Sequence, residues 1–290
     1  MGIDIHAFNF IKIQAACYPL GDVLTIGRHS LSLKPEKIEK YLNSVFESTG
    51  YCEPLLSALG AKSVSSLDCS DYEDATYVVD LNKTVNLGFQ FDTVIDSGSL
   101  EHIFDVAAAF RNIINLTKVG GRIIHFLPVN NLNGHGFWQF SSDLLYSIYS
   151  ENNGFETTEV YYASSLNESH WYKVPKAKPG VRVEIVSLEP IILLTVTRKV
   201  RNVESISVMQ PFYAVAWNGN DAPLVRLPEK LGSRIKTSMK RLVERHSRLS
   251  NFLRNCHLIF GLITGSSHYS INSTFFQKIE VDQVLQEHGR

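Results

Sequence analysis

The stretch that decides the fold covers residues 91–121, FDTVIDSGSLEHIFDVAAAFRNIINLTKVGG. It opens with a short apolar segment, residues 91–96, of the length expected for a buried strand. After a turn of small residues, apolar side chains recur three or four positions apart, which predicts a helix with one buried face. These side chains are Ile103, Val106, Ala107, Phe110, Ile113 and Ile114. Gly120-Gly121 should end the helix before a second strand, residues 122–126, so the stretch forms a crossover unit of a parallel sheet.

Ligands of parallel sheets bind beside the carboxyl ends of the strands. Residues 96–102 and 127–136 are therefore expected to border one pocket. The segments DTVIDSGSLEHIFD and LTKVGGRIIHFLP, in this order, resemble the later motifs of class I S-adenosylmethionine-dependent methyltransferases. The resemblance extends over about residues 21–155. It implies a three-layer, Rossmann-like α/β fold with a mostly parallel sheet of seven strands that ends in an antiparallel hairpin.

The same resemblance implies cofactor contacts in the turn after the first expected strand. This turn reads Gly27-Arg28-His29-Ser30 and has one glycine where the family usually has two or three. Gly27 would let the backbone approach the methionine part of S-adenosylmethionine. Arg28 or His29 would hydrogen-bond its carboxylate. The other interpretations are an ordinary strand end and a loop that is closed to the cofactor.

Acids also follow the later strands. Asp68 closes the second expected strand and would accept hydrogen bonds from the ribose hydroxyls, unless it is a solvated turn acid. Asp80 and Leu81 follow the third strand and correspond to the family's adenine contacts. Asp96 and Ser97, after the fourth strand, would face the methionine end of the cofactor.

Two histidines are the candidate catalytic residues. His102 follows Glu101 at the start of the expected helix, and both point toward the same rim. His135 lies between Gly134 and Gly136 after the fifth strand. A histidine at this place suits a general base, because its ordinary pKa lies near neutrality. The alternatives are a helix-start histidine bonded to nearby backbone and a structural loop histidine. No metal site is expected.

Composition indicates an ordinary globular protein. The 290 residues are 44% hydrophobic and 20% charged, with a net charge of −1, which gives no general attraction to nucleic acid or membrane. The four cysteines lie far apart, which disfavours a zinc site or a disulfide framework and favours the cytoplasm. No apolar run approaches the roughly 20 residues that cross a bilayer, and the N-terminus lacks the basic start of a signal peptide.

The expected domains are residues 1–205, with the methyltransferase-like fold, and residues 206–290, a C-terminal helical extension. Residues 1–20 should pack as a helix over the sheet edge, residues 164–181 should form a lid, and residues 181–186 and 191–200 should form the closing hairpin. Residues 227–256 predict a basic amphipathic helix. Its apolar stripe would dock on the domain or on a second subunit, as in a homodimer, or else the helix would bind an anionic partner. A loosely ordered tail is expected after residue 264.

The leading hypothesis is an S-adenosylmethionine-dependent methyltransferase that releases S-adenosylhomocysteine. Its acceptor is expected to be a small molecule, with oxygen of a sugar or secondary metabolite favoured and nitrogen left open. Nucleic acid is not expected, because the catalytic half lacks a basic stripe with stacking aromatics. The rival hypothesis is an inactive protein of the same fold that acts as a binding or scaffold subunit through the basic helix. A nicotinamide-dependent dehydrogenase is disfavoured, because no GxGxxG follows the first strand.

Overall fold

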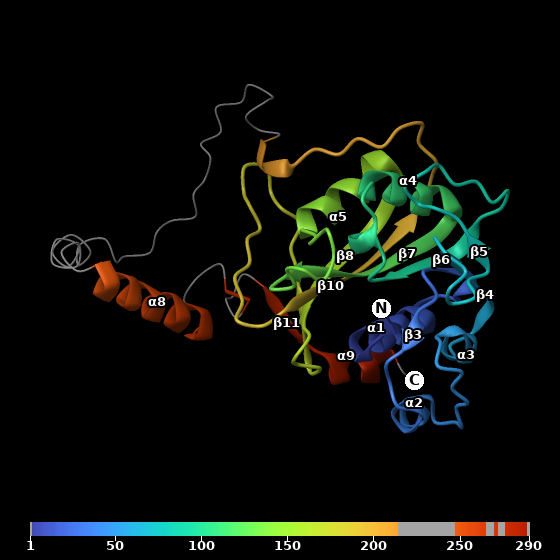
Figure 1. The fold of residues 1–290 in the computed structure, drawn as a ribbon, viewed down its shortest axis with the longest axis horizontal. Helices are drawn as coiled ribbons and strands as arrows, with labels where there is room; N and C mark the ends of the chain where they lie inside the picture. Colours follow the sequence, from blue (N-terminus) through green and yellow to red (C-terminus); the bar gives the residue numbers. More distant parts are fainter. Residues whose placement is uncertain (1, 214–246, 265–269, 272–275, 289–290) are drawn as a thin grey trace.

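The computed structural model describes residues 2–213, 247–264, 270–271 and 276–288 (Figure 1). Its main feature is a nine-stranded sheet with the order β11-β9-β8-β10-β7-β6-β2-β4-β5. One half of this sheet is parallel. Its strands are β2 (Gly21–Ile26), β4 (Ala61–Asp68), β5 (Tyr77–Val78), β6 (Phe91–Ser97) and β7 (Thr117–Asn130).

The other half of the sheet is antiparallel. β10 (Ile191–Lys199) inserts between β7 and β8 (Phe155–Ser164) and runs against both. β9 (His170–Lys173) and β11 (Gln277–Glu280) extend the sheet beyond β8. Seven of the strands, taken in chain order, therefore lie in the order three-two-one-four-five-seven-six, and the first five positions match the order of Rossmann-type sheets. The predicted α/β class is confirmed.

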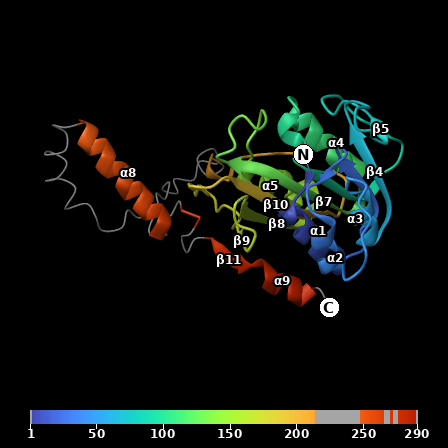
Figure 2. The same ribbon diagram turned by 60° about the horizontal axis from the view of Figure 1, so that its bottom comes forward.

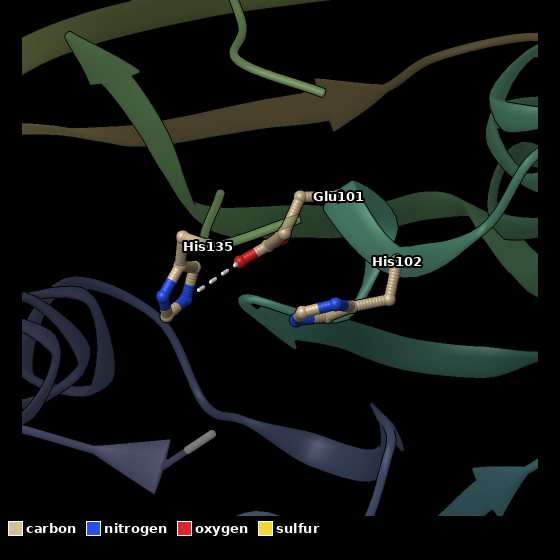
Figure 3. Close-up of side chains that lie close together, drawn as sticks. All are labelled: Glu101, His102 and His135. Atoms are coloured by element: carbon tan, nitrogen blue, oxygen red, sulfur yellow. Dashed lines mark ion pairs between the residues drawn. The ribbon is translucent and has the colours of Figure 1, made fainter. Parts of the chain in front are cut away.

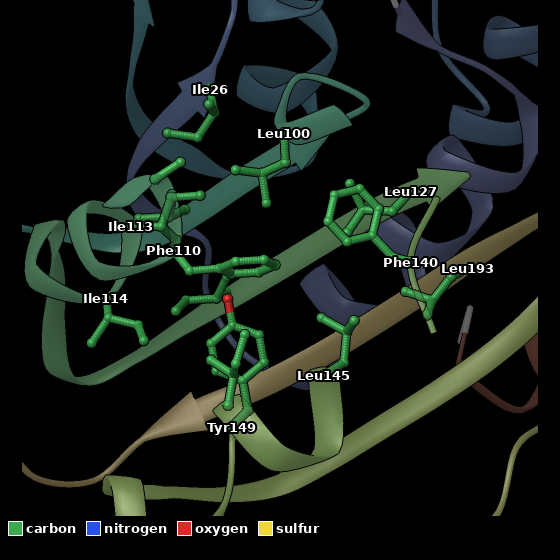
Figure 4. Close-up of a cluster of buried hydrophobic side chains, with 14 of the residues drawn as sticks. Ile26, Leu100, Phe110, Ile113, Ile114, Leu127, Phe140, Leu145, Tyr149 and Leu193 are labelled. Carbon is green, nitrogen blue, oxygen red and sulfur yellow. The ribbon is translucent and has the colours of Figure 1, made fainter. Parts of the chain in front are cut away.

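Helices cover both faces of the sheet and make three layers (Figure 1). α4 (Val106–Leu116) and α5 (Ser142–Ile148) lie on one face, over a core that includes Phe110, Leu145 and Tyr149 (Figure 4). The opposite face carries three N-terminal helices and a C-terminal one. They are α1 (Ile5–Cys17), α2 (Pro35–Leu42), α3 (Glu53–Ala58) and α9 (Val281–His288). A short two-stranded sheet joins β1 (Gly2–Ile3) to β3 (Ser30–Leu31).

The N-terminal helix lies on a face of the sheet, whereas the sequence predicted it over the sheet edge. α1 is buried over most of its length because it is apolar nearly all round. The ring of Phe10 meets those of Phe126, Tyr161 and Trp171 at centroid distances of 5.9, 5.9 and 5.5 Å. α1 therefore packs across β7, β8 and β9.

The helix of the central crossover unit is shorter than its pattern predicted. α4 begins at Val106 because the Asp105 carboxylate accepts a hydrogen bond from the amide of Ala108 and caps the helix. The preceding residues 100–102 form a separate 3-10 turn. The helix ends at Leu116, before the glycines expected to stop it, and β7 begins at once. Glu101 and His102 therefore belong to a turn between strand and helix.

Two predictions for the later chain are wrong. Residues 164–181 do not form a lid, because they contain β9, in which Trp171 is buried and donates a hydrogen bond to His6. Residues 181–186 are not a strand of the closing hairpin. Val183 and Ile185 pack against the core outside the sheet, and β8 takes the place beside β10.

The chain after residue 205 returns in part to the sheet. The predicted loose tail instead supplies β11 and α9, and α9 packs beside α1. The basic helix expected over residues 227–256 lies outside the described residues up to residue 246. From there α8 (Ser247–Thr264) stands apart from the sheet in both views (Figures 1 and 2). Among the described helices, each is too short or too polar to span a bilayer.

Candidate active site

The carboxyl ends of the parallel strands are aligned in one row. Ile26 of β2 pairs with Leu67 of β4 on one side and with Asp96 of β6 on the other. Leu67 in turn pairs with Tyr77 of β5, and Asp96 with His125 of β7. The residues that follow this row therefore emerge at one edge of the sheet, where α/β folds bind their ligands. They include Gly27 and the predicted acids Asp68 and Asp80.

The turn after β2 depends on its single glycine. Gly27 has φ +83° and donates its N–H to the Leu67 carbonyl at 2.7 Å. A Cβ here would lie 2.7 Å from the Ser99 hydroxyl oxygen, so a side chain is excluded by both conformation and space. Gly27 therefore brings the turn against the start of the next loop, as close approach to a ligand would require.

His29 fills the inner side of this turn. Its side chain is buried, and its Nε2 accepts a hydrogen bond from the Ser97 amide at 3.2 Å. Burial lowers the pKa of His29 to about 4, against the opposing effect of the nearby Asp96 charge. His29 is thus a neutral group that supports the end of β6, and the Ser97 amide has a protein partner.

Arg28 points to another group of residues. Its Nε donates to Glu53 at 2.7 Å and its Nη1 to the Glu73 carbonyl at 2.8 Å. Its guanidinium also lies 4.0 Å from the ring centroid of Tyr51. The hydrogen bond to Glu53 raises the pKa of Arg28 above its ordinary value. Arg28 fastens α3 and the loop at residue 73 to the turn, and these partners compete with its predicted contact to a cofactor carboxylate.

The predicted ribose residue Asp68 ends β4, and the predicted adenine residues Asp80 and Leu81 lie in the loop after β5. Asp68 accepts a hydrogen bond from the Ser70 amide at 3.2 Å. Asp80 accepts two from Asn82, and the side-chain one is the main reason that its pKa is lowered. Leu81 is buried, and its carbonyl accepts from the Asn112 side chain at 3.0 Å.

Asn112 is a residue that the sequence did not single out. It is buried on α4, and its Nδ2 also donates to the Lys83 carbonyl at 2.7 Å while its Oδ1 accepts from the Val85 amide at 3.0 Å. One side chain thereby satisfies three backbone groups of the loop that follows Asp80. Its position among apolar helix residues gave no signal of this role.

Asp96 belongs to a fully buried chain of hydrogen bonds. Its Oδ2 lies 2.9 Å from His125 Nδ1, and His125 Nε2 lies 2.5 Å from the Tyr149 hydroxyl. Its Oδ1 accepts from the Ser99 amide at 2.9 Å. Burial, and then the Asp96 charge, raises the pKa of Tyr149 well above its ordinary value, so its hydroxyl donates to His125. Because both Asp96 oxygens have partners inside the protein, this carboxylate shapes the strand ends from within.

Glu101, His102 and His135 form a cluster at the same edge (Figure 3). Ligand atoms of the three side chains lie within 4.8 Å of one another, and His135 Nε2 is 3.6 Å from Glu101 Oε1. Glu101 is 1% exposed, whereas the His135 side chain is 48% exposed. The structure thus brings together the two predicted catalytic histidines with a buried carboxylate.

The backbone holds the two loops of this cluster in register. The Glu101 carbonyl accepts hydrogen bonds from the amides of Phe137 and Trp138 at 2.7 and 3.3 Å. A Cβ at Gly136 would lie 2.7 Å from both the Glu101 carbonyl oxygen and its Cγ. Gly136 therefore lets the second loop lie directly on Glu101 and places His135 beside the carboxylate.

The main electrostatic feature of the cluster is a buried carboxylate, Glu101, with too few hydrogen-bond partners. Glu101 Oε2 makes no hydrogen bond within the described part of the chain. Burial, and then the Asp96 charge, raises the pKa of Glu101 to about 8. Burial, and then His135, lowers the pKa of His102. A cation at this place would offset the unfavourable charge of Glu101 and would be bound by the neutral forms of the two histidines.

Aromatic side chains surround the exposed side of the cluster. Phe137 and Phe104 are largely exposed and meet edge to face at a centroid distance of 6.3 Å. Trp138 is 39% exposed and donates its Nε1–H to the Ile103 carbonyl, whereas Phe140 is in the core. These rings offer an apolar surface beside His135 on which a flat or ring-shaped molecule could rest.

A cavity of about 630 Å³ opens at the opposite ends of the strands. Its lining includes Gly21 and Asp92, at the starts of β2 and β6, together with Tyr18 and Arg122. It includes none of the predicted site residues. The candidate site is accordingly defined by the converging side chains at the carboxyl ends, and not by this cavity.

No protein-family model and no curated protein matches the sequence. Comparison of the fold finds the N-methyltransferase NodS from Bradyrhizobium japonicum WM9, with 12% identity, TM-score 0.38, and coverage of 66% of this chain and 84% of that chain. The 1,6-didemethyltoxoflavin-N1-methyltransferase of Burkholderia thailandensis has 13% identity, TM-score 0.41, and coverage of 68% and 78%. A TehB-like S-adenosylmethionine-dependent methyltransferase of Corynebacterium glutamicum has 18% identity, TM-score 0.38, and coverage of 66% and 87%.

Likeness at these identities and TM-scores does not extend to activity. The fold assignment rests on the strand order and on the row of aligned strand ends. The chain has the Rossmann-like sheet that its sequence predicted.

Proposed function

We propose that this protein is an S-adenosylmethionine-dependent methyltransferase that acts on a small-molecule acceptor. The observation that carries the proposal is the alignment of Ile26, Leu67 and Asp96 across three parallel strands, which sets Gly27, Asp68 and the Glu101 loop at one edge. The sequence motifs of the methyltransferase family fall on these same strand ends.

The polar groups at this edge suit an adenosine-like cofactor. Asp68 and Asp80 are partly exposed carboxylates after adjacent strands, and they are acceptors of the kind that ribose hydroxyls and an adenine amino group need. Leu81 gives a buried apolar neighbour for a base. Gly27 permits close backbone approach, while Asp96 and Ser97 order the strand end beneath. When bound, the cofactor would supply a methyl group on an electrophilic sulfonium.

The cluster of Glu101, His102 and His135 would receive the acceptor. A hydroxyl acceptor loses its proton as its oxygen bonds to the methyl carbon, and the carbon–sulfur bond breaks with its electron pair left on sulfur. His135, the exposed member of the cluster, is placed to handle that proton. The neighbouring Phe137 and Trp138 favour a ring-bearing acceptor, such as a sugar or a secondary metabolite. An amine acceptor fits the same surface.

Two measurements test the proposal. Calorimetric titration should detect S-adenosylmethionine binding to the full chain, and turnover should be followed as S-adenosylhomocysteine formed from a library of hydroxylated small molecules. His135→Ala should lose turnover and keep cofactor affinity within about twofold, while His170→Ala, on the distant β9, should retain both. Absence of cofactor binding at millimolar concentration would contradict the proposal. Unchanged turnover in His135→Ala would remove this histidine from the chemistry.

The second candidate is a catalytically inactive binding or scaffold protein of the same fold. The partners of Arg28 and His29 favour it, because both side chains at the glycine turn are engaged by the protein itself. This candidate would bind its partner through the basic segment around residues 227–256, and that partner could be a second copy of the chain. It predicts no cofactor binding, so the same titration separates the two candidates.

A further inference from the structure

The cluster at the carboxyl ends of β6 and β7 has the donor set of a metal site. It offers one carboxylate oxygen from Glu101 and one ring nitrogen each from His102 and His135, all within 4.8 Å of one another. Figure 3 shows the Glu101 carboxylate and the His135 ring directed toward each other, with His102 beside them. Two histidines and one carboxylate with open remaining positions form a common binding set for divalent transition metals.

A second observation points to a missing partner at the same place. Glu101 is 1% exposed, yet its Oε2 has no hydrogen-bond partner within the described residues. A buried carboxylate oxygen without a partner is unfavourable, and buried charges are normally paired or bound to metal. A divalent cation would supply the partner that this buried oxygen lacks.

The spacing needs only small movements to bind an ion. Ligands at about 2.0–2.2 Å from a tetrahedral metal lie roughly 3.4 Å from one another. His135 Nε2 and Glu101 Oε1 are already 3.6 Å apart. The carboxylate is fixed by burial and by the Gly136 contact, whereas His102 and His135 are exposed.

We propose that Glu101, His102 and His135 bind one divalent transition-metal ion. The ion holds the two histidines as ligands and keeps a position open toward the aromatic surface of Phe137 and Trp138. Its role rests on the proposed function: with the ion bound, His135 would act as a ligand and would no longer accept the proton directly. An acceptor hydroxyl at the open position would then lose its proton to solvent more readily. The binding itself requires no methyltransferase activity.

The test uses the full chain, stripped with a chelator and titrated with MnCl₂ by calorimetry and by electron paramagnetic resonance of the free ion. Mn²⁺ is chosen because it has little preference for the exposed cysteine thiols of this chain. The variants are His135→Gln and Glu101→Gln. The matched control is His170→Gln, because His170 also faces a carboxylate, with Nε2 2.8 Å from Glu280 Oε1, but belongs to no three-ligand cluster within the described residues.

The intact chain should bind one Mn²⁺ per molecule. His135→Gln and Glu101→Gln should each raise Kd at least 100-fold, and His170→Gln should leave it within about twofold. His135 is half exposed on a loop, so its variant remains informative if Glu101→Gln fails to fold. No binding up to millimolar Mn²⁺, or an unchanged Kd in His135→Gln, would overturn the proposal. A parallel titration with S-adenosylmethionine reports separately on the proposed function.

Discussion

Replacement of His125 by phenylalanine probes the buried chain of hydrogen bonds under the candidate site. The substitution keeps an aromatic ring, which can retain the edge contact with Phe110 and the stacked contact with Tyr149. It removes both ring nitrogens, so Asp96 loses its partner at 2.9 Å and the Tyr149 hydroxyl loses its acceptor. Asp96 then keeps the hydrogen bond that its Oδ1 accepts from the Ser99 amide.

The expected cost follows from the burial of the pair. Both side chains are 0% exposed, and a buried charged group that loses a hydrogen-bond partner costs more than the about 1–3 kcal/mol of a neutral group. The unpartnered Tyr149 hydroxyl adds about 1–3 kcal/mol. A loss of at least about 3 kcal/mol in unfolding free energy should lower Tm by roughly 6 °C or more. The loss would be a large part of the roughly 5–15 kcal/mol that stabilise a domain.

Urea unfolding of His125→Phe, Asp96→Asn and the double variant measures this cost. Because the asparagine amide carries no charge, the double variant should lose about 1–3 kcal/mol less than the sum of the single losses. The control is His170→Phe, which removes a partly exposed pair with Glu280 and should cost about 0–1 kcal/mol. A loss in His125→Phe no greater than that of the control, or additive losses in the double variant, would refute the reasoning.

Three further predictions concern the loops around the site. Gly27→Ala should cost about 1–2 kcal/mol from the positive φ alone, and more from its contact with Ser99, so thermal melting should show a lower Tm. Asn112→Ala removes three hydrogen bonds to the loop that contains Leu81 and should lower the unfolding free energy, measured in urea, by about 3 kcal/mol. An unchanged unfolding free energy would show that the loop is stable without them. The folded pKa of His29 lies at about 4, below its ordinary 6.5, so the folded protein disfavours protonation. The contribution of His29 to the unfolding free energy is therefore complete above pH 6.5 and falls by up to about 3 kcal/mol toward pH 4. In His29→Gln, unfolding measured at these two pH values should lack this part of the pH dependence.

The parallel half of the fold could be predicted because its signals are local. β4 ends at Asp68, as predicted, and β6 is a short apolar run that ends in the polar Asp96 and Ser97, within one residue of its predicted end. The antiparallel half could not be predicted in the same way. β9 and β11 pair across a long separation in the chain. The alternating segment at residues 181–186 resembles a strand, but within the described residues it makes only an isolated bridge from Val186 to Ser270.

The candidate site was predictable only in part, for a related reason. His102 and His135 were recognised from their positions after two neighbouring strands. His125 lies inside an apolar strand segment, and only its pairing with Asp96 in the sheet reveals its role. The convergence of Glu101 with the two histidines depends on the contact at Gly136, which no spacing in the sequence records.

The central claim is that acids at aligned strand ends bind an adenosine-bearing cofactor, and Asp68 is the residue that tests it. Calorimetric titration of S-adenosylmethionine should compare the intact chain with Asp68→Ala and with Asp71→Ala, which removes an exposed acid of the same loop. The loss of hydrogen bonds to a carboxylate, worth about 1.5–3 kcal/mol, predicts a Kd raised roughly 10-fold to 150-fold in Asp68→Ala. Asp71→Ala should bind as the intact chain does. Equal affinities in all three proteins, or no binding by the intact chain, would contradict the claim.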